Sequence, residues 1–184
     1  MNRRIWCLGL VTSLAAYTVP LSAFAQQVPA RLERVRQRWR HLIPEGFEFP
    51  EPSQAVERNE EEWHAMLSPL AYRVLRKGAT EPAGSSALNG EHRPGLYVCA
   101  GCDLPVFSSE MKYDSGTGWP SFYTTIPGVF ETKRDFVLLF PRTEYHCVRC
   151  GSHHGHVFDD GPPPTHERWC NNGVALRFIP QGLA

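Results

Sequence analysis

The sequence predicts a mainly β, α+β fold in which short N-terminal helices precede two small antiparallel sheets. Helical spacing of apolar residues ends near residue 78, and from residue 95 short apolar runs are separated by Gly, Pro, Asp and Asn. Such runs are typical of strands. Because no helical pattern separates them, they favour antiparallel sheets over a doubly wound parallel sheet. Two Cys-x-x-Cys pairs, each at the end of a predicted strand, add a double knuckle to this fold.

The composition is that of one ordinary globular domain with tails. The chain has 184 residues, of which 42% are hydrophobic and 21% charged, close to globular averages. Nineteen basic residues balance nineteen acidic ones. Nucleic acid is therefore not an expected partner, because phosphate binding usually requires a basic excess. Six cysteines are too few for a miniprotein held together by disulfides.

Residues 1–25 have the pattern of a secretory signal peptide. Arg3 and Arg4 precede an uncharged, mostly apolar stretch that ends in Ala-Phe-Ala at Ala25. A basic region, an apolar region and an A-x-A site predict cleavage after Ala25 and export, with the periplasm as the expected location. A retained membrane anchor is the alternative, since the stretch is long enough to span a bilayer. Cleavage would remove Cys7 and leave no stable membrane span.

Residues 26–58 are predicted to form a helical appendage and a linker. Apolar residues recur there at helical spacing among several arginines: Leu32, Val35, Trp39 and Leu42. The helix should end before Pro44, and further prolines mark a linker. A basic amphipathic helix can lie on a membrane surface, but packing on the chain's own domain is the interpretation we favour.

The domain itself is predicted over residues 59–181 and begins with two short helices. Asn59 can cap the first helix, whose opening turn holds three glutamates that suit the helix dipole. Ser68 and Pro69 have the pattern of an N-cap and first helical residue, and Gly78 can end the second helix.

The remaining elements are predicted strands. The candidates are residues 95–99, 128–131, 136–140, 144–148, 156–158 and 174–179. The segment 136–140 is apolar on both faces, which predicts a central buried strand.

The two Cys-x-x-Cys pairs have the spacing of a metal site. Cys99, Cys102, Cys147 and Cys150 would supply the four sulfurs of a tetrahedral structural zinc, one ion per chain. Disulfides are one alternative, because export favours oxidation. A redox dithiol in one pair is another. We favour zinc, because a doubled Cys-x-x-Cys is far more specific for metal than a single one.

Cys170 is left over as a candidate nucleophile. A reactive thiol needs a cation or donor nearby, and Arg168 lies on the same side of the chain if this segment is extended. His153 and His156 could transfer protons. An inert buried cysteine with surface histidines, or a second zinc held by the histidines, explains the same residues.

A turn rich in glycine precedes this region and completes the set of motifs. Gly116 and Gly118 flank Thr117, and Trp119 and Phe122 follow. The turn should be exposed and its aromatic residues could form an apolar wall. Packing in the core is the alternative for the aromatic residues.

Together these motifs resemble the B-type peptide methionine (R)-S-oxide reductases. The resemblance covers residues 59–181 and rests on Gly-Leu-Tyr-Val-Cys-x-x-Cys at 95–102, Ser-Gly-Thr-Gly-Trp-Pro-Ser-Phe at 115–122, Arg-Thr-Glu at 142–144 and the run from 147 to 178. It implies two antiparallel sheets with structural zinc. It also implies an enzyme of protein repair under oxidative stress, which reduces the R epimer of methionine sulfoxide in oxidised proteins.

The resemblance assigns roles to individual residues. Cys170 is the implied nucleophile, and the four knuckle cysteines hold the zinc. Trp119 forms the wall for the methyl group of the substrate, with Phe158 also expected in substrate binding. The residues implied around the reacting sulfur are His153, His156, Arg168 and Asn172.

Some positions depart from the family pattern. Thr117 stands where many members have a resolving cysteine, so we expect an external thiol, from a thioredoxin-like protein or a small molecule, to reduce the oxidised Cys170 directly. His154, Trp169 and the pair His166-Glu167 also depart, and we expect them around the pocket or its approach.

Two other classes of protein fit parts of the pattern. A zinc-ribbon binding module without catalysis would use the knuckles and treat Cys170 as structural. A dithiol oxidoreductase would use one Cys-x-x-Cys pair directly.

Overall fold

The structure is a computed structural model that describes residues 21–135 and 141–182. The predicted central strand at 136–140 and most of the predicted signal peptide lie outside the described residues. Of the described part, no helix is long and apolar enough to cross a membrane.

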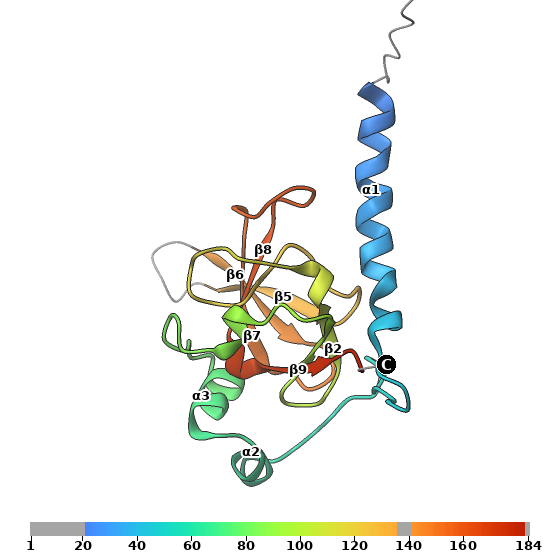
Figure 1. The fold of residues 1–184 in the computed structure, drawn as a ribbon. Helices are drawn as coiled ribbons and strands as arrows, with labels where there is room; N and C mark the ends of the chain where they lie inside the picture. The colour runs from blue at the N-terminus through green and yellow to red at the C-terminus, as the bar shows by residue number, and fades with distance from the viewer. Residues whose placement is uncertain (1–20, 136–140, 183–184) are drawn as a thin grey trace, which may run out of the picture.

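Helix α1 (Leu21–Arg38) is longer than the sequence pattern predicts. It begins before the predicted cleavage site at Ala25. A 3-10 turn, η1 (Trp39–Leu42), continues it. Val35 and Trp39 pack against the core, and the side chain of Arg36 donates a hydrogen bond of 2.8 Å to Thr124. The end of this helix therefore packs on its own domain, as expected, while its first turns extend past the β core (Figure 1).

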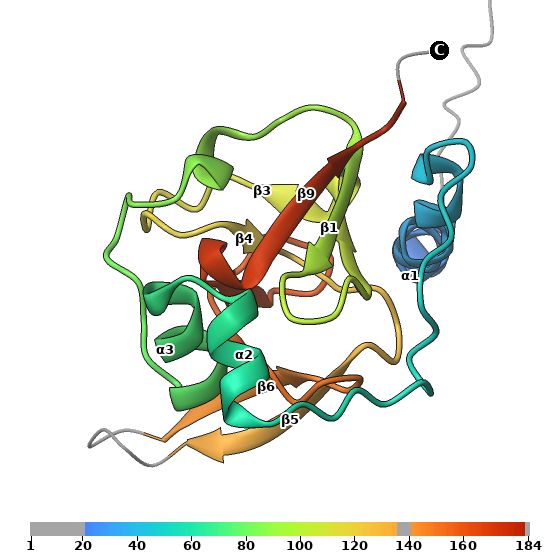
Figure 2. The ribbon, with the colours of Figure 1, turned by 90° about the horizontal axis from the view of Figure 1, so that it is seen from below.

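Helices α2 (Glu60–Met66) and α3 (Pro69–Lys77) begin and end where the capping residues predict. Asn59 and Glu62 form a reciprocal capping box, which satisfies two backbone donors at the start of α2. Ser68 caps α3, and Gly78 ends it in the left-handed region at φ 66°. Figure 2 shows α1 and α3 on opposite sides of the β core.

Two antiparallel sheets form the core of the molecule, as predicted. The smaller sheet has the order β2-β1-β9 and the larger one β3-β4-β8-β7-β6-β5. The strands of the smaller sheet are β1 (Gly95–Cys99), β2 (Pro105–Ser108) and β9 (Leu176–Pro180). Those of the larger sheet are β3 (Lys112–Tyr113), β4 (Ser121–Phe122), β5 (Phe130–Asp135), β6 (Arg142–Cys147), β7 (His153–Phe158) and β8 (Arg168–Asn171).

Aromatic side chains join the inner faces of the two sheets. Phe107 of β2 stacks on Phe122 of β4 with ring centroids 3.9 Å apart. Tyr97 of β1 meets the same Phe122 ring edge-on at 5.0 Å. All three side chains are fully buried. Phe122 therefore belongs to the core, which decides between the two interpretations of that residue.

A β-bulge in β7 decides which way its histidines point. Tyr145 pairs with Gly155, whereas the next residue of β6, His146, pairs with His153. His154 is thus the extra residue, and it reverses the alternation of side chains. His153 and His156 consequently share one face, with ring centroids 5.5 Å apart, and His154 enters the core.

Gly155 is required by the close approach of β7 to β8. A Cβ atom at this position would collide with the backbone carbonyl of Cys170. A side chain here would push apart the strand that carries His156 and the strand that carries Cys170.

Candidate active site

The four knuckle cysteines come together in one buried cluster. Cys99 ends β1 and Cys147 ends β6, while Cys102 and Cys150 lie in the turns that follow. All four sulfurs lie within 4.8 Å of one another. The cluster therefore joins the smaller sheet to the larger one.

The sulfur distances match a metal site and not disulfides. The Sγ atoms of Cys99 and Cys150 are 3.6 Å apart, as are those of Cys102 and Cys147. A disulfide would bring two sulfurs to about 2.05 Å. A tetrahedron with metal–sulfur bonds of about 2.3 Å has edges of about 3.8 Å. The residues present thus fit a tetrahedral thiolate-bound ion.

The two knuckles are built in the same way. The backbone amide of Asp103 donates to the carbonyl of Cys99, and that of Gly151 donates to the carbonyl of Cys147, each at 2.8 Å. Asp103 and Gly151 both have φ near 65°, at 63° and 66°. The left-handed residue closes each turn, so that the two cysteines of each knuckle direct their sulfurs toward the same cluster.

Three guanidinium groups hold the backbone of the knuckles. The distances from their nitrogens to the carbonyl oxygens are 2.6 Å for Arg149 to Cys102, 3.0 Å for Arg58 to Gly101 and 2.9 Å for Arg76 to Cys150. Four thiolates around a divalent ion carry two negative charges, so these cations also balance the charge of a filled site.

Cys170 lies in a separate small pocket near the middle of the larger sheet. In β8 it pairs with Ser121 of β4 on one side and His156 of β7 on the other. The pocket has a volume of about 120 Å³ and the sulfur is partly exposed. Five residues that the sequence assigned to the site line this pocket: Trp119, His156, Phe158, Cys170 and Asn172. The other lining residues are Thr80, Arg142, Gly155 and Asn171.

Opposing effects set the charge of the Cys170 thiol. Burial raises the pKa of Cys170, while the guanidinium of Arg168 and a hydrogen bond with Thr117 lower it. Burial has the largest effect, so the pKa lies above its ordinary value. Thr117, the position of the missing resolving cysteine, is thus near enough to influence the pKa of the nucleophile.

Arg168 is held in place by an acid and an aromatic ring. Asp160 accepts two hydrogen bonds from the guanidinium, at 2.7 and 2.9 Å. The same guanidinium lies 4.3 Å from the centre of the Phe158 ring. As predicted from an extended segment, Arg168 and Cys170 share one face of β8.

His156 is a neutral imidazole at neutral pH. Burial lowers the pKa of His156, and the hydrogen bond with Asp135 only partly opposes this effect. Its Nε2 lies 3.0 Å from the Asp135 carboxylate, which also accepts a 2.6 Å hydrogen bond from Arg142. The carboxylate assigns the proton to Nε2 and leaves Nδ1 as an acceptor.

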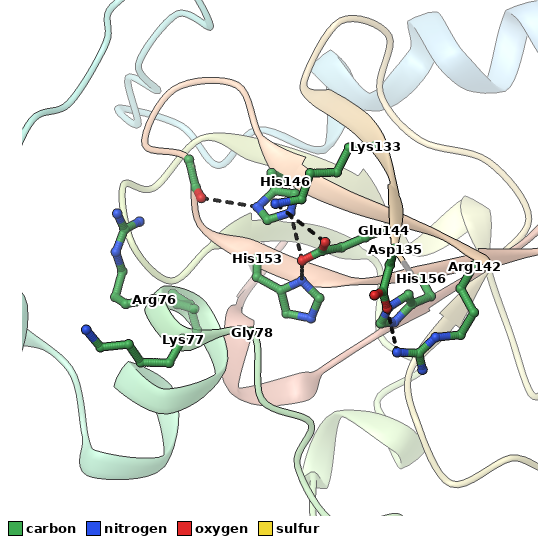
Figure 3. Close-up of a pocket in the computed structure, with 12 residues that line it drawn as sticks. Arg76, Lys77, Gly78, Lys133, Asp135, Arg142, Glu144, His146, His153 and His156 are labelled. Carbon is green, nitrogen blue, oxygen red and sulfur yellow. Dashed lines mark hydrogen bonds and ion pairs between the residues drawn. The ribbon is translucent and has the colours of Figure 1, made fainter. Parts of the chain in front are cut away.

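His153 does not line the Cys170 pocket but an adjoining cleft (Figure 3). Its Nδ1 lies 2.7 Å from the Glu144 carboxylate. Burial lowers the pKa of His153 to about 4. His156 and Arg142 line both the cleft and the pocket, whereas His153 lines the cleft alone. The expected position of His153 at the reacting sulfur is therefore not what the pocket lining shows.

Asn172 lines the pocket, but its amide is engaged by the backbone. It donates to the carbonyl of His154 and accepts from the amide of Glu81, each at 2.9 Å. The carbonyl of Glu81 accepts a 3.1 Å hydrogen bond from the Trp119 indole. Asn172 therefore positions the walls of the pocket.

Glu81 is a residue that sequence reasoning missed. Its side chain is only 2% exposed, and its carboxylate accepts hydrogen bonds from the amides of Gly173 and Val174 at 2.6 and 3.0 Å. No local motif identifies it, because all its partners are distant in sequence. Asp135 and Asp160 were also missed, although their arginine partners, Arg142 and Arg168, are only seven and eight residues away and Asp160 lies in the run that resembles the family.

The remaining departures from the family pattern do not line the pocket itself, and His154 lies in the core, not at the pocket or its approach as expected. The bulge turns His154 into the core, where it is fully buried beside Phe130. Trp169 lies on the face of β8 opposite Cys170 and meets Tyr145 edge-on at 4.9 Å. Glu167 accepts a hydrogen bond from Trp169 and, like His166, is absent from the pocket lining.

The site combines a four-cysteine centre with a separate cysteine that lies in a pocket lined by aromatic rings and is influenced by a guanidinium. This combination is typical of a cysteine-dependent enzyme. The model of the SelR domain matches residues 67–180. Proteins named peptide methionine sulfoxide reductase MsrB are similar to the chain. The one from Methanosarcina barkeri is 48% identical, over 68% of this chain and 89% of its own. The one from Pseudomonas putida is 48% identical, over 70% and 97%, and that from Leptospira interrogans 46%, over 67% and 95%.

The chain therefore belongs to the SelR family of MsrB reductases. The matched residues lie inside the predicted domain 59–181 and include all four knuckle cysteines and Cys170.

The charge balance at Cys170 predicts how fast it is alkylated at different pH values. We expect the rate of modification by iodoacetamide to rise with pH around a midpoint above that of an ordinary thiol, about 8.5. In the R168Q variant the midpoint should move further upward, because the thiolate loses its cation. Mass spectrometry of the peptide that contains Cys170 measures the rate.

The R177Q variant is the matched control, since Arg177 pairs with Asp103 on the exposed surface. It should keep the midpoint of the unaltered protein. An unchanged midpoint in R168Q would show that the guanidinium does not stabilise the thiolate.

Proposed function

We propose that this protein reduces the R epimer of methionine sulfoxide in oxidised proteins to methionine, with Cys170 as the nucleophile. The observation that carries this proposal is the pocket in which Cys170 and the Trp119 ring are lining residues, with the Arg168 guanidinium near enough to lower the pKa of the thiol although it is not itself a lining residue. Methionine sulfoxide combines an apolar methyl group with a polar oxygen, so it needs both an aromatic wall and polar groups. Membership of the SelR family supports the same reaction.

The proposed reaction transfers the sulfoxide oxygen to Cys170. The thiolate attacks the sulfoxide sulfur and forms a sulfur–sulfur bond. The protonated oxygen then moves from the substrate sulfur to the Cys170 sulfur, so the sulfur–oxygen bond of the substrate and the new sulfur–sulfur bond both break, Cys170 becomes a sulfenic acid and methionine leaves. The thiol proton ends on the transferred oxygen, which balances the step. Because His156 is neutral, it can accept the proton from the Cys170 thiol and donate it to the sulfoxide oxygen, directly or through bound water.

Restoring Cys170 takes two electrons from thiols outside the chain. Among the described residues, the other cysteines are the four of the buried cluster, and Thr117 occupies the position from which a resolving cysteine would act. A first external thiol would form a mixed disulfide with Cys170 and release water. A second would then release the Cys170 thiol and leave an external disulfide. We propose a thioredoxin-like protein or a small thiol as this donor.

We also propose that the four-cysteine cluster holds one structural Zn²⁺. Four buried sulfurs at tetrahedral spacing are the ligand set that zinc prefers. When bound, zinc would supply a crosslink between the two sheets and no catalytic step. Export to the periplasm remains a proposal that rests on the pattern of residues 1–25.

The central test compares the two epimers of methionine sulfoxide. With dithiothreitol as the electron donor, we expect turnover of peptides that contain the R epimer and none with the S epimer. The C170S variant should lose at least about a thousandfold in rate, because removal of a nucleophile leaves only binding contributions. Chromatography of the peptides measures conversion, and a melting curve confirms that C170S is folded.

Two outcomes would overturn the proposed function. Activity on the S epimer alone would reverse the stereochemical assignment. Full activity in C170S would leave Cys170 a structural residue, as a zinc-ribbon binding module requires.

The source of electrons is tested by a single turnover without added thiol. We expect Cys170 to remain a sulfenic acid, trapped by dimedone, with no disulfide inside the chain. In the T117C variant, the same turnover should give a disulfide between positions 117 and 170, because Thr117 is near enough to influence the pKa of the Cys170 thiol. Mass spectrometry of peptides under non-reducing conditions distinguishes the two products.

The T125C variant serves as a control, because the Thr125 hydroxyl donates a hydrogen bond to the carbonyl of Ile126 and the residue does not line the pocket. It should behave like the unaltered protein. A disulfide from Cys170 to another native cysteine would contradict direct reduction by an external thiol.

Metal extraction tests the zinc proposal. Removal of one zinc per chain should expose four reactive thiols besides Cys170. It should also lower the melting temperature sharply, because the ion joins β1 to β6 and its binding free energy adds to that of folding. Elemental analysis, thiol titration and calorimetry measure the three quantities. A chain that contains zinc but melts at the same temperature after extraction would show that the ion is not structural.

A further inference from the structure

A second group of metal-binding side chains lies in the cleft beside the Cys170 pocket. Glu144, His146 and His153 bring one carboxylate oxygen and two imidazole nitrogens within 4.8 Å of one another. We propose that these three residues form a second metal site, separate from the four-cysteine cluster, for a divalent transition-metal ion such as Zn²⁺. The proposal does not depend on the reductase activity.

The sheet itself brings the three ligands together. Glu144 and His146 are two residues apart in β6, so their side chains leave the same face of the strand. His153 of β7 pairs directly with His146. The bulge at His154 lies just beyond this pair, which allows the three side chains to meet over one face of the sheet (Figure 3).

One carboxylate oxygen lies close to both imidazole nitrogens. The Glu144 Oε1 atom is 2.9 Å from the Nε2 of His146 and 2.7 Å from the Nδ1 of His153. In spite of these short distances, neither nitrogen has a hydrogen bond of acceptable geometry within the described part of the chain. Buried nitrogens without hydrogen bonds are unfavourable. A cation coordinated by all three atoms would satisfy them together.

The site is firmly held and still open to solvent. The side chain of His153 is 3% exposed, that of Glu144 14% and that of His146 20%. They border a cleft of about 490 Å³, which leaves room for water as a further ligand. Two histidines, one glutamate and an open position are a well-known ligand set for zinc.

The basic side chains of the cleft pair with groups other than the Glu144 Oε1 atom that faces the histidines. Arg142 pairs with Asp135 at 2.6 Å, Lys77 with Glu60 at 3.2 Å, and Arg76 donates to the carbonyl of Cys150. Lys133 lies 3.5 Å from the other oxygen of Glu144, Oε2. Because these positive charges remain nearby, we expect the site to bind more weakly than the four thiolates.

The other two histidines of β7 are excluded as ligands. His154 points into the core and bonds to Asn171 at 3.1 Å. His156 is engaged by Asp135 at 3.0 Å. The proposed site thus differs from the alternative of a zinc held by the neighbouring histidines, because it uses one of them and two residues of the adjacent strand.

Counting bound metal tests the proposal. The full chain, free of any histidine tag and with the four-cysteine cluster loaded, is dialysed against micromolar Zn²⁺, and zinc is measured by mass spectrometry. We expect two ions per chain in the unaltered protein and one in each of the variants H146N and E144Q. The control H64N should keep two, because His64 stacks on Tyr72 of α3 and lies outside the site.

Cobalt identifies the ligands of the second ion. Co²⁺ added to the zinc-loaded protein should give the weak absorption of nitrogen and oxygen ligands without the strong sulfur-to-metal band that thiolates produce. H146N should remove this absorption while its melting temperature shows an intact fold.

Three results would overturn the second site. One zinc per chain in the unaltered protein would show that the cleft does not bind the ion. A second ion retained in both H146N and E144Q would place it elsewhere, and a strong sulfur band would assign it to Cys170.

Discussion

The convergence of four thiols at the ends of β1 and β6 is the constraint on which the rest of the structure depends. It is the contact that ties the smaller sheet to the larger one at a fixed point. Phe107 and Phe122 then fill the space between the sheets. From β6, the pairing of neighbouring strands carries this fixed position through β7 to β8 and so to Cys170. The four-cysteine cluster thus fixes the frame on which the Cys170 pocket is built.

The Cys170 pocket balances burial against charge. Burial protects the sulfur and raises its pKa, which lowers the fraction of thiolate, while Arg168 and Thr117 act in the opposite direction. Asp160 fixes the guanidinium but also adds a negative charge that disfavours the thiolate. The site therefore holds its nucleophile mainly as a thiol. In the proposed reaction, that thiol supplies the proton which the sulfoxide oxygen must receive.

Local signals in the sequence predicted the elements that are determined locally. The capping residues Asn59, Ser68 and Gly78 and the two knuckles lie where the pattern places them. Short strands such as β3 and β4 were missed, because two residues carry no periodicity and become strands only through their partners. Glu81 was missed because its hydrogen bonds reach residues about 90 positions away. The position of His154 was wrong, since a bulge depends on the pairing of two strands and leaves no mark in one of them.

Strand β6 carries residues of all three sites within six positions: Arg142 at the Cys170 pocket, Glu144 and His146 in the cleft, and Cys147 in the cluster. The bulge at His154 sets the pairing of β7 with this strand, so that Gly155 lies opposite Tyr145 and His153 lies opposite His146. The bulge therefore constrains the number of residues between positions 153 and 155. A deletion or insertion of one residue between positions 153 and 155 would exchange the two faces of β7 on one side of the change. The number of residues in this segment is therefore constrained in addition to the identity of Gly155.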